Sequence, residues 1–155
     1  MKTRTAILAA VLGTALAVPS TALADKSFAG KTAQNRSVTL TTGDDNVLKT
    51  FRINWITRRC AQSGSRFQHM TAFRPPFDLA TGDEFRDAGS FRVRDDGGIR
   101  SRVRITITGR HAFDPANPAA ENWFGTVKAR IVVRRRGRII DRCNLRSTNW
   151  SAGIA

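Results

Sequence analysis

The sequence offers few side chains for acid–base chemistry. His69 and His111 are its two histidines, and tyrosine is absent. His111 stands at the end of an expected strand, before a loop that leads to Glu121, and the fold could bring Glu84 to the same place. A histidine and a carboxylate that face an arginine-lined cleft would provide the general acid, general base and charge stabilisation for phosphodiester cleavage. His69 alternates with Phe73, which predicts an inward-facing histidine and not a catalyst.

Other catalytic and metal-binding signatures are absent from the sequence. It contains no glycine-rich phosphate loop, no His-Glu-x-x-His pattern and no nucleophile elbow. Asp44-Asp45-Asn46 and Asp95-Asp96-Gly97 lack the glycine and the distant glutamate that complete a calcium loop, so both predict turns. We expect no cofactor and no metal. A non-enzymatic role is preferred to a hydrolase that uses His111 and Glu121.

Two cysteines, Cys60 and Cys143, predict one disulfide. An even cysteine number without a Cys-x-x-Cys pair is typical of a structural bond in an exported protein. In the chain-entropy model, closing a loop of about 80 residues stabilises a fold by roughly 4 to 5 kcal/mol. The bond would reinforce a domain that is already long enough to bury a core.

The N-terminus has the features of a cleavable export signal, expected over residues 1–24. Lys2 and Arg4 precede a weakly apolar run, residues 6–18, and Ala22-Leu23-Ala24 is the small-x-small pattern that signal peptidase accepts. This run is too short to cross a bilayer, and no later run reaches the ~20 residues of a spanning helix. We expect a secreted protein, extracellular, cell-wall associated or periplasmic, with no transmembrane segment after cleavage.

The remaining residues, 25–155, predict one strongly basic domain. The whole chain has 26 lysines and arginines against 12 acids. Once the two basic residues of the leader are removed, arginine supplies 20 of the remaining 24. Arginine binds phosphate, sulfate or carboxylate with two donors at once, which favours an anionic partner. An ordinary solvated surface is the alternative, because net charge reports on association and solubility and not on activity.

Alternating hydrophobicity predicts an all-β fold. Arg100 to Thr108 alternates apolar residues with arginine or threonine, and Thr126 to Arg134 repeats this pattern. Three earlier segments, around Leu40, Ile53 and Thr71, have the same period, and no useful window shows a helical repeat. We therefore expect an antiparallel β-sandwich of about six to eight strands with one disulfide.

Glycines within polar segments predict two hairpins with three-residue loops. In the first, Gly97 would be left-handed and Val93 would lie opposite Ile99. In the second, Gly137 would be left-handed. Val133 would then lie opposite Ile139, Ile131 opposite Asp141, and Ala129 opposite Cys143. A two-residue loop is less favoured, because it would turn Cys143 toward the arginines.

These registers predict an arginine-rich outer face. Arg130 would oppose Arg142, Arg134 would oppose Arg138, and Arg92 would oppose Arg100. Opposed like charges destabilise a sheet unless an anion neutralises them. The predicted binding residues are Arg92, Arg100, Arg102, Arg104, Lys128, Arg130, Arg134, Arg138 and Arg142.

Several short landmarks resemble those of a group of uncharacterised secreted single-disulfide β-domain proteins of actinobacteria. The landmarks are Phe28-x-Gly30-Lys31-Thr32-x-Gln34, Trp55 before Cys60, Gly89-x-Phe91, Gly109, Phe124-Gly125, Cys143 and Trp150-x-Ala152. The resemblance implies a compact β domain outside the cytoplasm, and it transfers no catalytic or binding residue.

The sequence thus favours a secreted, non-enzymatic β module that binds an anionic polymer through its arginines. Cell-wall glycan, nucleic acid and acidic lipid are the candidate ligands. A small secreted phosphodiesterase or nuclease using His111 with a carboxylate is one alternative. A structural cell-envelope protein with a protein partner is another.

Overall fold

A computed structural model describes residues 25–43, 47–75, 77, 79–81, 83–95, 97–113, 116–117 and 120–155. The expected leader and the Asp44-Asp45-Asn46 turn lie outside these residues. Within the described part of the chain, no helix is long and apolar enough to span a membrane.

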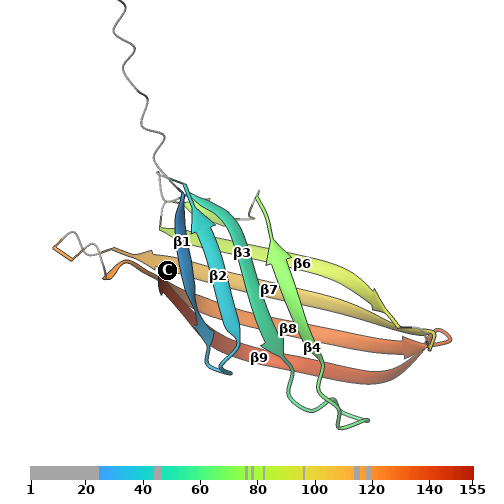
Figure 1. Cartoon of the computed structure of the whole chain (residues 1–155). Coiled ribbons are helices and arrows are strands. Elements are labelled where there is room, and N and C mark those ends of the chain that lie inside the picture. Colours follow the sequence, from blue (N-terminus) through green and yellow to red (C-terminus); the bar gives the residue numbers. More distant parts are fainter. Residues whose placement is uncertain are drawn as a thin grey trace, which may run out of the picture.

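The described residues form one nine-stranded antiparallel sheet (Figure 1). The strand order is β4-β3-β2-β1-β9-β8-β7-β6-β5. The strands are β1 (Lys26–Thr32), β2 (Ser37–Thr42), β3 (Leu48–Ile56), β4 (Gln68–Phe73), β5 (Leu79–Thr81), β6 (Glu84–Arg94), β7 (Ile99–Ala112), β8 (Asn122–Arg135) and β9 (Arg138–Ile154).

The sheet curls on itself, so that β1 to β4 cross over β6 to β9 (Figure 1). The expected all-β antiparallel class is confirmed, but two separate sheets are not found, because β1 pairs with both β2 and β9. At 17 residues, β9 is long enough to pair with β8 along its length and with β1 at its C-terminal end. One barrel-like sheet therefore replaces the predicted sandwich.

The core fills the space between the two halves of the curled sheet. Phe51 lies at its centre, with ring centroids 4.9 Å from Trp150 and 5.6 Å from Phe85. Trp55 is fully buried and donates its indole N–H to the Thr71 hydroxyl at 2.9 Å. Six predicted inward residues of β7 and β8 are buried as expected, namely Val103, Ile105, Ile107, Val127, Ala129 and Ile131, and the seventh, Val133, is partly buried against the core.

In the described segments, β4 and β6 share no backbone pairing. Side-chain contacts join these two strands across the curl. The His69 ring stacks on Phe91 with centroids 4.8 Å apart. Burial lowers the pKa of His69, which favours the neutral form of the ring. This agrees with the predicted inward-facing histidine.

Two glycines make room for close packing in the middle of the sheet. Gly109 pairs with Gly125, and these are flanked in the same row by Phe85 on β6 and Trp150 on β9. A Cβ on Gly125 would overlap the backbone of Thr108, and a Cβ on Gly109 would overlap the Phe85 ring. The missing side chains let the backbones approach and leave room for the Phe85 ring.

The turn of the β6–β7 hairpin lies one residue later in the chain than the predicted turn. Arg94 lies opposite Arg100, the Asp95 N–H donates to the Ile99 carbonyl, and Gly98 has the positive φ, 72°. The prediction that Gly97 is left-handed is wrong. The Asp95 carboxylate also accepts the Ile99 N–H at 2.8 Å, which places the turn one residue later.

The β8–β9 hairpin has a two-residue turn, which corrects the predicted three-residue loop. Arg135 lies opposite Arg138, and Arg136 and Gly137 have φ of 48° and 83°. A β-bulge follows, at which the pairing steps from Arg134↔Ile139 to Val133↔Asp141. Because the bulge inserts one residue, Cys143 still faces the core; it lies opposite Ile131 instead of Ala129.

The predicted disulfide is present and fastens a loop to the free edge of β9. Cys60 and Cys143 are bonded, with Cα atoms 4.2 Å apart. Arg58 and Ala61 donate their N–H groups to the carbonyls of Asn144 and Arg142. The loop thus occupies edge groups that would otherwise be open to another strand.

Candidate functional site

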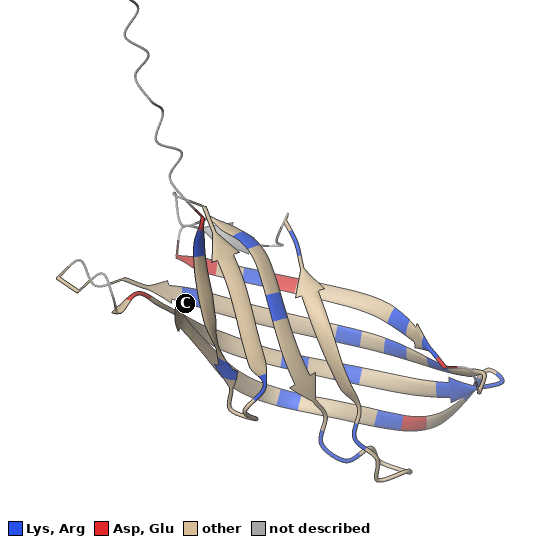
Figure 2. Cartoon of the chain, in the orientation of Figure 1, with Lys and Arg blue, Asp and Glu red and all other residues tan. Residues whose placement is uncertain are grey.

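Arginines recur along β6 to β9 (Figure 2), and their alternating exposure places them in rows on the outer face of the sheet. Arg100 lies opposite Arg94 on one side and Arg134 on the other, and Arg104 lies opposite Arg130. These opposed pairs replace the predicted ones. Arg92 lies opposite Arg102, Arg142 opposite Val132, and Arg138 opposite Arg135.

Across β7, β8 and β9 this face is hollowed into a groove of about 960 Å³, here called the arginine groove. Seven basic side chains line it: Arg102, Arg104, Lys128, Arg130, Arg134, Arg142 and Arg146. Among the described residues, no carboxylate lies within ion-pair distance of any of the seven. The groove is therefore a concentrated, uncompensated positive surface.

Six of the nine predicted binding residues line the arginine groove, namely Arg102, Arg104, Lys128, Arg130, Arg134 and Arg142. Arg92 and Arg100 belong to the same outward rows, and Arg138 lies at the hairpin turn. Arg146, which also lines the groove, lies within the arginine-rich face predicted over residues 92–104 and 128–146.

Sequence reasoning missed Arg58. It lines a smaller groove next to Arg146, because the disulfide-bonded loop places it against β9. Since Cys60 is two residues away and its partner Cys143 lies in the arginine-rich strand, the predicted disulfide was a usable signal for this neighbourhood.

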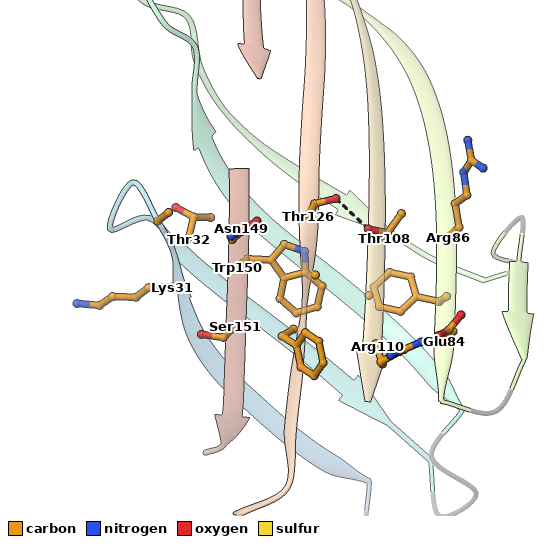
Figure 3. A pocket seen from close by; sticks show the side chains of 15 residues that line it. Lys31, Thr32, Glu84, Arg86, Thr108, Arg110, Thr126, Asn149, Trp150 and Ser151 are labelled. Atoms are coloured by element: carbon orange, nitrogen blue, oxygen red, sulfur yellow. Dashed lines mark hydrogen bonds and ion pairs between the residues drawn. The ribbon is translucent and has the colours of Figure 1, made fainter. Parts of the chain in front are cut away.

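A second groove, of about 910 Å³, crosses the same strands at Gly109 and Gly125, and Figure 3 shows it from close by. Gly109 and Gly125 contribute to its lining, together with the hydroxyl pair Thr108 and Thr126, whose oxygens lie 2.9 Å apart. Phe124 at its wall is 43% exposed. We call it the glycine groove.

Charges in the glycine groove are mixed. Lys31 and Arg86 are exposed cations on its lining, and Arg110 forms an ion pair with Glu84. The buried Trp150 nitrogen, which belongs to a lining residue, has no hydrogen-bond partner. Polar groups, a cation and an exposed ring in one hollow are suited to hold a ring-containing unit of a ligand.

The two grooves follow one another along the strands. Thr106 and Lys128 line the arginine groove, and Thr108 and Thr126 are the next outward residues on the same strands in the glycine groove. Arg100 and Arg110 lie ten positions apart on β7, which is about 33 Å of extended chain. An extended molecule can therefore contact both grooves.

The structure brings His111 and Glu121 together, as the alternative hypothesis required. His111 Nε2 lies 2.8 Å from Glu121 Oε1, and Nδ1 lies 3.3 Å from Asp83. Lys26 Nζ lies 3.0 Å from the other Glu121 oxygen. The imidazole of His111 stacks on the Trp123 ring, with ring centroids 4.9 Å apart.

This cluster is closed to a ligand in the present arrangement. The His111 side chain is 0% exposed, both of its nitrogens face carboxylates, and it lines neither groove. Glu121 is also buried. The contacts instead join the start of β1, the end of β7 and the segment before β8, which supports a role in stability.

One group of potential metal ligands occurs among the described residues, formed by Cys60, Asp141 and Cys143. The two sulfurs are bonded to each other, so neither is available as a thiolate. The Asp141 carboxylate is occupied by N–H and hydroxyl donors of the disulfide-bonded loop. The group therefore serves to hold that loop.

Comparison of the chain with protein-family models, curated proteins and solved structures returned no match.

Proposed function

We propose that this protein is a secreted, non-enzymatic module that binds an extended anionic polymer along the outer face of β7, β8 and β9. The observation that carries the proposal is the arginine groove, with seven basic side chains and no carboxylate partner among the described residues. A nucleic acid or an acidic envelope glycan has the required repeating negative charge.

Electrostatics supports such a ligand. Directly opposed arginines such as Arg104 and Arg130 destabilise a sheet by tenths of a kcal/mol to about 1 kcal/mol for each pair. A bound polyanion would relieve this repulsion. It would also release its condensed counterions, which makes the affinity fall steeply as salt rises.

The geometry favours a polymer over a small anion. The arginine groove continues into the glycine groove along the same strands. A polymer on the basic part would place its next units beside Phe124 and the threonine hydroxyls. Exposed rings support stacking of bases or sugars, which adds affinity without strict sequence recognition.

Fluorescence anisotropy tests this proposal. Labelled single-stranded RNA and labelled polygalacturonate are each mixed with the purified protein and followed over time at several salt concentrations. We expect a stable rise with at least one polymer, weakened by salt with a log–log slope of up to about 5 for the RNA if all seven side chains meet phosphates.

A charge-matched pair of variants locates the site. The triple variant Arg104→Gln, Arg130→Gln, Arg142→Gln should reduce the RNA slope by about 2, since three phosphate contacts are lost. Arg52→Gln, Arg66→Gln, Arg74→Gln removes the same charge from exposed positions outside the groove and should leave the slope unchanged. Equal losses in both variants would mean that net charge, and not the groove, binds the polymer.

Two other outcomes would overturn the proposal. A rise followed by decay would indicate cleavage and an enzyme. No rise with either polymer would favour the alternative of an envelope protein with a protein partner.

A further inference from the structure

Two hairpin tips lie side by side at one end of the long strands (Figure 1). The register Ile99↔Arg135 joins the β6–β7 turn to the β8–β9 turn. At the second turn, Ile139 and Ile140 are adjacent in sequence and are 40% and 41% exposed. These isoleucines and the arginines around them, within residues 94–95, 97–100 and 134–140, are here called the tip.

The β-bulge exposes both isoleucines. Regular alternation would turn one of two neighbouring residues inward, but the pairing passes from Ile139 directly to Asp141, and Ile140 is the extra residue. Two adjacent aliphatic side chains therefore project at the end of a hairpin. Nothing in the core requires them there, because the inward position is filled by Asp141.

Arginines surround this apolar pair. The tip contains Arg94, Arg100, Arg134, Arg135, Arg136 and Arg138. Asp95 is the described acid of the tip, and its carboxylate accepts the Ile99 N–H. Asp141, next to the tip, is buried and faces away. Exposed aliphatic residues ringed by cations are suited to an anionic lipid surface, where the apolar groups enter the acyl boundary and the cations meet phosphates.

The turn itself contains an arginine in a strained position. Arg136 has φ 48°, the left-handed region in which asparagine or glycine would be relaxed. Backbone strain of this kind often accompanies function. Here it retains a positive charge in the two-residue turn of the hairpin.

The opposite end of the strands has balanced charge. Asp83, Glu84 and Glu121 lie where β6 and β8 begin and β7 ends, but Arg110 pairs with Glu84 and Lys26 pairs with Glu121. An anionic surface would therefore attract the tip more strongly than this end.

We propose that the tip docks end-on to an anionic lipid bilayer, with Ile139 and Ile140 inserted into the interface and the tip arginines bound to lipid phosphates. This contact uses the end of the sheet and leaves the arginine groove free along most of its length. The protein would then hold a polymer near a membrane surface.

Vesicle flotation tests the proposal. The purified protein is mixed with vesicles of phosphatidylcholine and phosphatidylglycerol, or with phosphatidylcholine alone. We expect binding to the mixed vesicles and at least tenfold weaker binding to the neutral ones. The double variant Ile139→Ser, Ile140→Ser should weaken binding to the mixed vesicles by roughly tenfold or more, because the inserted apolar surface is lost.

Controls separate this contact from groove binding and from unfolding. Val47→Ser with Met70→Ser removes two other exposed apolar side chains and should keep vesicle binding. The tip double variant should keep RNA anisotropy unchanged if the groove binds RNA. Arg136→Asn should weaken vesicle binding because a tip charge is removed. Asparagine fits the left-handed position without strain, so the midpoint of thermal unfolding of this variant should not fall.

Unchanged vesicle binding in the Ile139→Ser, Ile140→Ser variant would overturn the proposal, since contact would then be electrostatic alone. Equal binding to neutral vesicles, or no binding to either kind, would also overturn it. None of these results depends on whether the arginine groove binds a polymer.

Discussion

Ser63 donates both its backbone N–H and its hydroxyl to the carboxylate of Asp141, although 78 residues separate them in sequence. Gln62 donates its N–H to the other carboxylate oxygen at 2.9 Å. Asp141 faces inward on β9, as predicted, and these donors explain how an acid is tolerated there. The disulfide at Cys60 brings the donors to it, so the covalent bond and the hydrogen bonds hold the same loop.

This arrangement makes the stability of the fold depend on pH. The hydroxyl of Ser63, followed by the N–H of Gln62, lowers the pKa of Asp141 from 3.8 to about 2, although burial opposes the shift. A carboxyl group whose pKa is lower in the folded state stabilises that state fully above its unfolded pKa. This contribution is lost as the pH falls from about 4 to about 2.

We expect Asp141→Asn to lower the free energy of unfolding at neutral pH and to reduce its decline in acid. Urea denaturation of both proteins across the acid range measures the difference. Asp25→Asn removes an exposed carboxylate paired with Lys49 and serves as the control. A decline in Asp141→Asn as steep as in the wild type would show that other acids dominate.

The close backbone approach at Gly125 provides a second test. Gly125→Ala should destabilise the fold strongly, by about 2 kcal/mol or more, because its Cβ would overlap the Thr108 backbone, which has no rotamer with which to move away. Gly89→Ala is the matched control, since its Cβ would lie 3.9 Å from Ile105 in ordinary contact. Thermal unfolding should separate the two variants. Similar midpoints would mean that β7 and β8 move apart here at little cost.

The buried histidine cluster predicts a structural effect. His111→Ala should lower the stability by roughly 3 kcal/mol or more, because Glu121 would remain buried with one of its partners lost and a cavity would form beside Trp123. Chemical denaturation measures this loss. Incubation of wild type and variant with RNA should show no cleavage by either. If the wild type cleaves RNA and the variant folds normally but does not cleave it, the nuclease hypothesis is correct.

Alternation along a strand predicts which face a residue occupies, but not its partner. Cys143 and Asp141 were predicted to face inward and do so, yet each lies two positions away from the predicted register. A two-residue turn followed by a bulge shifts the pairing by an even number, which preserves the faces. The first hairpin moved in the same way when its turn shifted to Gly98.

Pairing between strands joined by long loops was beyond sequence reasoning. The opposition of Arg104 and Arg130 depends on the register of β7 against β8, and the loop between them has no turn signature that sets this offset. The curl into one sheet depends on β9 reaching β1, which local periodicity does not report. The basic surface was therefore predictable as a face, whereas its groove was not.

The opposed arginines predict a conflict between stability and binding. Arg104 faces Arg130 across β7 and β8, and Thr106 two residues further along β7 shows that threonine suits this surface. Arg104→Thr should raise the free energy of unfolding by a few tenths to about 1 kcal/mol at low salt, because one like-charge pair is removed. The gain should shrink as salt screens the repulsion, while RNA affinity falls.

Arg52→Thr is the control, because Arg52 lies between Thr39 and Ala72 and opposes no charge. Urea denaturation at low and high salt, run beside anisotropy, measures both quantities. A loss of stability in Arg104→Thr at low salt would show that repulsion across this pair is not a feature of the unliganded protein.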